Sequence, residues 1–271
     1  MKRIIFAVNF IAITITLHAA QIDSVMITSR SMDTKIKTAV IVPEIALGDS
    51  AKRCPVIYLL HGYGGSEKQW LYIKPDLLQI ADEKNIIFVI PDGKNSWYLN
   101  SPLDKNSQYE TFISSELIEF TDSSYKTLPD RNHRAITGLS MGGHGALFNA
   151  FRHKEIFGAA GSMSGAVDIR QRGNNSGLVK LLGSFDQYPE NWDNNSVLNH
   201  TASINSGDLA IYIDCGKDDF CFKQNETLHA ELNRLGINHD YTIRPGAHTH
   251  DYWRNSIDYH ILFFSKYFQA A

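Results

Sequence analysis

The chain has 271 residues, of which 43% are hydrophobic and 20% are charged, and its formal net charge is -3. This length suits one large α/β domain or two small ones, and it is enough to bury a substantial core. The weakly acidic balance, without any basic block, excludes the strongly basic surfaces that bind nucleic acid or anionic membranes.

The first twenty residues have the layout of a secretory signal peptide. Lys2 and Arg3 precede an apolar run over residues 4–17, and the small residues Ala19 and Ala20 follow. Such a segment is normally removed during export. The alternative, a membrane anchor, fits less well because the run is short and contains polar residues. We therefore expect a secreted or periplasmic protein, with residues 1–20 as signal peptide and no stable membrane anchor.

Residues 21–271 alternate strand-like and helix-like segments. Strands are predicted at Val25–Ser29, Lys35–Val42, Pro55–Leu60, Ile86–Ile90, Ala135–Thr137, Ala159–Ser162, Leu209–Ile213 and Tyr241–Arg244. Helices are predicted at Tyr72–Asp82, Tyr109–Phe120, Gly143–Arg152, Asn225–Leu235 and Tyr252–Phe268. This alternation predicts one α/β domain, with a mostly parallel sheet and helices on both faces. Residues 167–208 are polar and weakly periodic, and we interpret them as a cap or loop insertion over the site.

A serine hydrolase motif lies where one of these strands meets a helix. Gly138-Leu-Ser140-Met-Gly142 is a G-x-S-x-G pentapeptide between the strand at 135–137 and the helix at 143–152. A serine on such a tight strand-to-helix turn has its hydroxyl exposed at the sheet edge. The amides of the new helix point to where negative charge develops. The motif predicts Ser140 as a nucleophile.

A serine nucleophile needs a base and an acid, which follow it in this fold class in the order acid, then histidine. The loop after the strand at 209–213 offers three candidate acids: Asp214, Asp218 and Asp219. The loop after the strand at 241–244 offers two candidate bases, His248 and His250. Both loops follow strand ends at the edge where α/β sheets place their sites.

An oxyanion hole requires two backbone donors, one after the serine and one from an upstream loop. The Met141 amide is the first. The loop His61-Gly-Tyr63-Gly-Gly65 directly follows the strand at 55–60, and the Tyr63 N–H is the expected second donor. Its glycines allow the backbone to approach a substrate closely.

Several of these segments together resemble the esterase D family, which includes S-formylglutathione hydrolases, tributyrin-type esterases and feruloyl esterase domains. The resemblance spans about residues 35–268. It rests on the segments at residues 58–65, 91–98, 138–147, 214–219, 246–248 and 252–253. It implies an α/β-hydrolase fold and the hydrolysis of carboxylic esters or thioesters, without a metal or other cofactor.

The resemblance also favours particular residues among the alternatives. The acid of the family stands third after a glycine, which from Gly216 selects Asp219. The family's histidine lies shortly after a glycine and ahead of an aromatic pair, which favours His248 over His250. Trp97 and Tyr98 lie on a loop at the expected site edge, and we interpret them as substrate-binding or as packing residues, with Trp192 a weaker candidate.

The leading hypothesis is an exported serine carboxylesterase. Its substrate would be a small-molecule or polysaccharide-linked ester, such as a feruloyl or acetyl ester of a plant polysaccharide. Alternatives are an S-formylglutathione hydrolase, against which the signal peptide argues, and an acyltransferase on the same triad. A non-enzymatic binding protein fits least, because the whole catalytic set is present.

Three cysteines are few for an exported protein. Cys215 and Cys221 either form a disulfide, leaving Cys54 buried, or all three are free. Without a C-x-x-C pair they are poor metal ligands, and the histidines near residue 250 complete no metal-binding set. We expect no metal, and the sequence does not define an oligomeric state.

Overall fold

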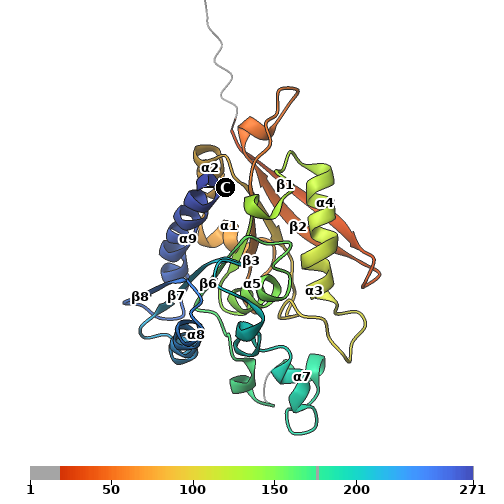
Figure 1. Cartoon of the computed structure of the whole chain (residues 1–271). Helices are drawn as coiled ribbons and strands as arrows, with labels where there is room; N and C mark the ends of the chain where they lie inside the picture. The colour runs from red at the N-terminus through yellow and green to blue at the C-terminus, as the bar shows by residue number, and fades with distance from the viewer. Residues whose placement is uncertain (1–18, 175–176, 271) are drawn as a thin grey trace, which may run out of the picture.

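The computed structural model describes residues 19–174 and 177–270 (Figure 1). The predicted signal peptide, residues 1–20, therefore falls almost entirely outside the described residues. Among the helices of the described part, none is both long enough and apolar enough to cross a bilayer.

Within the described residues, eight strands form one mixed sheet in the order β1-β2-β4-β3-β5-β6-β7-β8. Strand β2 is antiparallel to both of its neighbours, and the pairs from β4 to β8 are parallel. The strands are β1 Gln21–Ser29, β2 Thr34–Val42, β3 Val56–Leu60, β4 Ile87–Pro91, β5 Arg134–Gly138, β6 Ala159–Met163, β7 Ala210–Gly216 and β8 Asp240–Arg244. The expected mostly parallel sheet is confirmed.

Helices cover both faces of the sheet. One face carries α3 Tyr109–Thr111, α4 Leu117–Ser124, α5 Met141–Arg152 and α8 Phe222–Arg234; the other carries α1 Gln69–Ile73, α2 Leu77–Lys84 and α9 His250–Ala270. Figure 1 shows α9 and α4 on opposite sides of the strands. Strand β3 is buried throughout, with Tyr58 in one core and Ile57 in the other, because successive side chains point to opposite faces.

The helix predicted at Tyr72–Asp82 is two helices in the structure. Helix α1 ends at Ile73 and α2 begins at Leu77, with Pro75 between them. Proline disfavours a helical conformation in the residue before it and has no amide to donate, so the chain breaks there. The predicted helix at Tyr109–Phe120 instead continues to Ser124, through a π-helical turn at Phe112–Glu116.

Strand β7 is longer than expected and runs through Gly216, which pairs with Arg244 of β8. Asp214 is consequently part of the strand, not of the following loop. It is fully buried and accepts a hydrogen bond from the Arg244 guanidinium. Burial raises the pKa of Asp214 to about 6.

In the described residues of the segment 167–208, the regular structure consists only of short helices. They are η4 Ile169–Arg172, α6 Val179–Leu182, α7 Pro189–Asp193 and η5 Val197–Ser203. Figure 1 shows this segment, in green to teal, at one end of the molecule. Its η5 packs against α5, and the His144 ring of α5 bonds to the Asn195 carbonyl. The segment thus packs on the helix that follows Ser140.

Candidate active site

Ser140 lies between β5 and α5 with φ 54° and ψ -114°, a conformation that side-chain-bearing residues rarely adopt. Its backbone is fixed on both sides: the Ser140 N–H donates to the Met163 carbonyl at 2.9 Å, and its carbonyl accepts from Ala166 at 3.2 Å. This is the strained strand-to-helix turn that the motif predicts.

The two glycines of the motif are required by close backbone packing. A Cβ on Gly138 would lie 2.6 Å from the Leu60 carbonyl oxygen, and one on Gly142 would lie 2.7 Å from the His61 carbonyl oxygen. Larger residues would push the turn away from β3. The glycines therefore bring Ser140 close to the loop that follows β3.

His248 connects the serine to an acid. Its Nε2 is 2.8 Å from Ser140 Oγ, and its Nδ1 is 2.9 Å from both carboxylate oxygens of Asp219. A carboxylate accepts hydrogen bonds, so Nδ1 carries the proton and the free Nε2 accepts from the serine hydroxyl. This tautomer is the one a general base requires.

The structure distinguishes the alternative acids and bases. Asp218 is exposed, while Asp214 is fully buried and accepts a hydrogen bond from Arg244. Asp219 is 5% exposed and also accepts from the Cys221 N–H at 2.7 Å, which fixes its carboxylate. His250 is exposed at the start of α9, with its ring against Trp253.

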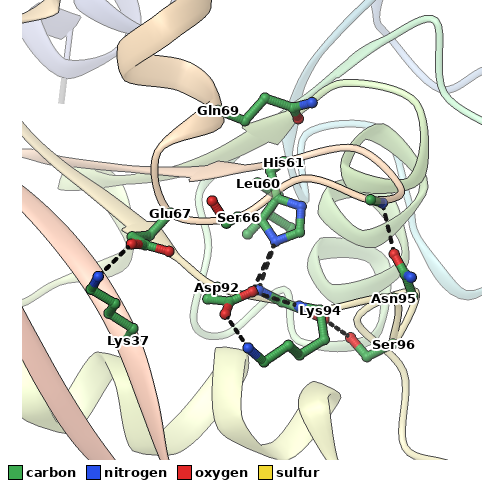
Figure 2. A network of polar contacts seen from close by, with 12 residues as sticks. Lys37, Leu60, His61, Ser66, Glu67, Gln69, Asp92, Lys94, Asn95 and Ser96 are labelled. Atoms are coloured by element: carbon green, nitrogen blue, oxygen red, sulfur yellow. Dashed lines mark hydrogen bonds and ion pairs between the residues drawn. The ribbon is translucent and has the colours of Figure 1, made fainter.

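Three side chains hold the glycine loop after β3, and Figure 2 shows the polar contacts around it. The Gly62 N–H donates to Gln69 Oε1 at 2.8 Å, and the Gly64 N–H donates to Asn95 Oδ1 at 2.7 Å. His61 accepts from the Gly93 N–H through Nε2 at 2.8 Å, so its Nδ1 carries a proton and donates to the Gly62 carbonyl at 2.7 Å. His61 therefore fixes the loop.

These contacts leave the Tyr63 amide available. The Gly65 N–H donates to the Gly62 carbonyl at 3.0 Å, so the neighbouring amides of the loop are all occupied. Among the residues that the structure describes, none accepts from the amide of Tyr63 or from that of Met141, the first residue of α5. Both expected oxyanion donors are thus free to bind a ligand.

A cavity of about 520 Å³ opens beside Ser140 and His248. Trp97 lines it, as expected for a substrate-binding residue. Tyr98 does not: it is fully buried, packs against Gly93 and Gly145, and donates its hydroxyl to the His61 carbonyl. Trp192 is likewise buried, with its Nε1 donating to the Gly183 carbonyl at 3.0 Å. For these two residues the structure shows the packing alternative and no place in the lining of the pocket.

Helix α5 holds the turn that presents Trp97. Both Trp97 and Tyr98 have a φ of 58°, which costs backbone strain in residues with side chains. Asn149 Nδ2 donates to the Tyr98 carbonyl at 2.9 Å, and His144 Nδ1 lies 3.2 Å from the Trp97 carbonyl. The helix that begins at the serine thus also positions a pocket wall.

The remaining pocket residues were not identified from the sequence. They include Gln69, Arg172, Phe220 and Trp253. The ring centre of Phe220 lies 4.2 Å from that of His248. In the sequence, only its position directly after Asp219 indicated that Phe220 lies near the site. Arg172 lies in the weakly periodic segment 167–208, where the sequence pattern does not indicate which way a side chain points.

The three cysteines are buried and free in the structure. Burial raises the pKa of Cys54 to about 11 and that of Cys221 to about 12. Asp219, Cys221 and His248 have ligand atoms within 4.8 Å of one another, a spacing that a metal ion could use. The protonated thiol is a poor ligand, and both nitrogens of His248 already serve Ser140 and Asp219.

The sheet, the serine turn and its histidine and acid define the α/β-hydrolase class. The family described as "Putative esterase" matches residues 29–264 of the chain. An acetyl esterase of Caldicellulosiruptor saccharolyticus is 32% identical over 213 residues, which are 74% of this chain and 79% of the relative. The chain belongs to this esterase family and is a carboxylesterase.

Solved structures agree in fold. A ferulic acid esterase superposes with a TM-score of 0.79 at 25% identity, covering 92% of this chain and 99% of that one. An S-formylglutathione hydrolase from Agrobacterium tumefaciens superposes with a TM-score of 0.78 at 20% identity, covering 93% and 97%. The resemblance expected from the motifs is confirmed at the level of the family and the fold.

Proposed function

We propose that this carboxylesterase acts through an acyl-enzyme on Ser140, with His248 as general base and Asp219 as the group that orients it. The main support for this proposal is that the His248 imidazole contacts both groups. Its Nε2 lies 2.8 Å from Ser140 Oγ, and its Nδ1 lies 2.9 Å from the Asp219 carboxylate oxygens. An alkyl hydroxyl is a weak nucleophile, and this arrangement is the usual means of activating it.

In the first half-reaction, Ser140 Oγ attacks the ester carbonyl while its proton moves to His248 Nε2. The carbonyl oxygen becomes an oxyanion, which the amides of Tyr63 and Met141 stabilise. His248 then gives the proton to the departing alcohol as the carbon–oxygen bond breaks. In the second half-reaction, water gives a proton to His248 Nε2 and attacks the acyl carbon. His248 then returns that proton to Ser140 Oγ as the bond between Oγ and the acyl carbon breaks, and the acid leaves. Each oxyanion donor typically contributes about 3–4 kcal/mol to transition-state stabilisation.

The proposed substrates are acyl esters such as acetyl or feruloyl groups on a plant polysaccharide. Two observations support this choice. The chain is similar to an acetyl esterase and to a ferulic acid esterase. The cavity is large enough for an aromatic acyl group, and Trp97, Phe220 and Trp253 give it aromatic walls.

We also propose export, with cleavage near Ala20. The basic start, the apolar run and the small residues of the first twenty positions support it. Mass spectrometry of the protein recovered outside the cytoplasm tests the proposal. A mature N-terminus near residue 21 is expected, and an intact, cytoplasmic chain would contradict it.

The activity is tested with wild type and Ser140→Ala on p-nitrophenyl acetate, p-nitrophenyl butyrate, methyl ferulate and S-formylglutathione. We expect ester hydrolysis that the substitution reduces by roughly 10⁴-fold or more. Equal activity of both proteins would overturn the proposal, and a strong preference for the thioester would favour the S-formylglutathione hydrolase alternative. Asp219→Asn should lose far more activity than Asp218→Asn, and His248→Ala far more than His250→Ala.

A further inference from the structure

One charged side chain distinguishes the pocket. Among the described residues that line it, Arg172 is the only lysine, arginine, aspartate or glutamate. An arginine side chain is a cation whose planar guanidinium carries five N–H donors. Its positive potential therefore acts on whatever the cavity holds beside Ser140 and His248.

Two aromatic rings of the pocket hold this guanidinium. Its central carbon lies 5.7 Å from the ring centre of Trp97 and 5.2 Å from that of Phe220. The Phe220 ring in turn lies 4.2 Å from the His248 ring. Such cation–π contacts orient an arginine without using its hydrogen-bond donors. Arg172 is thus fixed near the reacting groups with its donors still available.

Among the residues that the structure describes, none neutralises Arg172 through a hydrogen bond or an ion pair. Within the described residues, its guanidinium makes no hydrogen bond or ion pair, and its Nε is buried without a partner. Arg170, in the same 3-10 helix, instead bonds to Asp168 at 2.6 Å and Asp193 at 3.1 Å. The nearby Asp219 is committed to His248 and to the Cys221 amide. The planar donor set of Arg172 therefore lacks the carboxylate that such a fork usually binds.

We propose that Arg172 binds a carboxylate carried by the substrate, so that the enzyme selects anionic esters. This inference rests on the proposed function, because it places the anion in the cavity that Ser140 serves. The substrate class comprises monoesters of dicarboxylic acids and esters whose alcohol part carries a carboxylate. Both present the same group to Arg172, from opposite sides of the reacting carbonyl.

Two pairs of substrates test the proposal and separate the two sources. Monomethyl glutarate against dimethyl glutarate places the free carboxylate on the acyl side. 4-Acetoxybenzoate against methyl 4-acetoxybenzoate places it on the alcohol side. We expect wild type to show a higher kcat/KM for the anionic member of at least one pair. The pair that shows the preference identifies the side.

Three variants assign the preference to Arg172. Arg172→Gln should lower kcat/KM for the preferred anionic ester by about 10- to 100-fold, the usual range for a lost hydrogen bond to a charged group. The loss on the neutral ester should be much smaller, because that ester offers no carboxylate to Arg172. Arg172→Lys should keep part of the preference, because it retains the charge but not the fork. Lys180→Gln removes an exposed cation of the same segment and should behave as wild type.

The results that would overturn the proposal are specific. No preference in either pair, or an equal loss on anionic and neutral esters in Arg172→Gln, would mean that Arg172 only supports the aromatic walls. Calorimetric binding of 4-acetoxybenzoate and monomethyl glutarate to Ser140→Ala, with and without Arg172→Gln, gives a readout independent of hydrolysis. Arginine-dependent binding without any ester hydrolysis by wild type would reject the proposed function and leave the anion site standing.

Discussion

The backbones of Gly216 and Gly246 touch, and this contact joins the loop of Asp219 to the loop of His248. A Cβ on Gly216 would lie 2.7 Å from the Gly246 carbonyl carbon and closer still to its oxygen. The Asp218 N–H donates to the same carbonyl at 2.9 Å. Asp219 lies three residues after Gly216, and His248 lies two residues after Gly246. The distance between the Asp219 and His248 side chains therefore depends on this contact.

Gly216→Ala should therefore separate the acid from the base. We expect a loss of about 1–3 kcal/mol in the free energy of unfolding from overpacking. We also expect a fall in kcat of roughly 100-fold, because small misplacements of catalytic groups are costly. Ester hydrolysis and thermal unfolding measure the two effects.

Gly158→Ala is the matched control. Its Cβ would overlap the Arg131 carbonyl oxygen at the amino end of β6, on the edge of the sheet away from the site. This variant should lose stability but keep its kcat. If both variants lost stability and neither lost kcat, the contact would not set the catalytic geometry.

Gln69 should act on the transition state through the Gly62 amide. Gln69→Leu leaves that buried N–H without its acceptor, and the glycine loop should shift. We expect kcat to fall by about tenfold with little change in KM, because the oxyanion forms only during the reaction. Gln79→Leu on the surface of α2 is the control. A rise in KM at constant kcat would instead assign Gln69 to substrate binding.

His144 should make the protein less stable in acid. Burial lowers its pKa to about 4, although the carbonyls of Asn195 and Trp97 partly oppose this. The unfolded chain, with an ordinary pKa of 6.5, binds the proton more readily. The stability from this residue is thus complete above pH 6.5 and is lost as the pH falls towards 4. One such group contributes roughly 3 kcal/mol over this window.

Denaturant unfolding of wild type and His144→Gln between pH 7 and pH 4 measures this effect. The variant should show a shallower loss of stability with falling pH. Asp214, whose raised pKa acts in the opposite direction, is present in both proteins and cancels in the comparison. Parallel curves for the two proteins would contradict the assignment to His144.

The cysteines should be unreactive while the protein is folded. All three are buried and free, and their raised pKa values keep them protonated at neutral pH. A thiol-specific chromogenic reagent at pH 8 should react with none before unfolding and with three afterwards. A count of one after unfolding would reveal a disulfide between Cys215 and Cys221.

The sequence predicts the parts of this molecule that depend on local chemistry. Continuous apolar runs identified the buried strands, and strand ends identified the loops of Ser140, Asp219 and His248. The broken helix at Pro75 shows the limit of periodicity, because the apolar pattern continues across a residue that cannot continue a helix. The predicted length of strand β7 is too short, because the end of this strand is set by its pairing with β8, which lies further along the sequence.

Side-chain direction in irregular segments could not be predicted. Trp97 and Tyr98 are adjacent, yet one lines the pocket and the other is buried behind the glycine loop. Both have left-handed backbones, and the Tyr98 carbonyl is bound by the side chain of Asn149, 51 residues away in the sequence. The position of Arg172 in the pocket also depends on contacts between residues distant in sequence, because tertiary packing places its segment beside Phe220.

Covalent labelling shows whether His248 activates Ser140 as the nucleophile. The protein is treated with phenylmethylsulfonyl fluoride, and its peptides are analysed by mass spectrometry while the loss of esterase activity is followed. We expect one adduct, on Ser140, formed in step with inactivation and far more slowly in His248→Ala. Inactivation with the adduct on another residue, or labelling of His248→Ala at the wild-type rate, would contradict it.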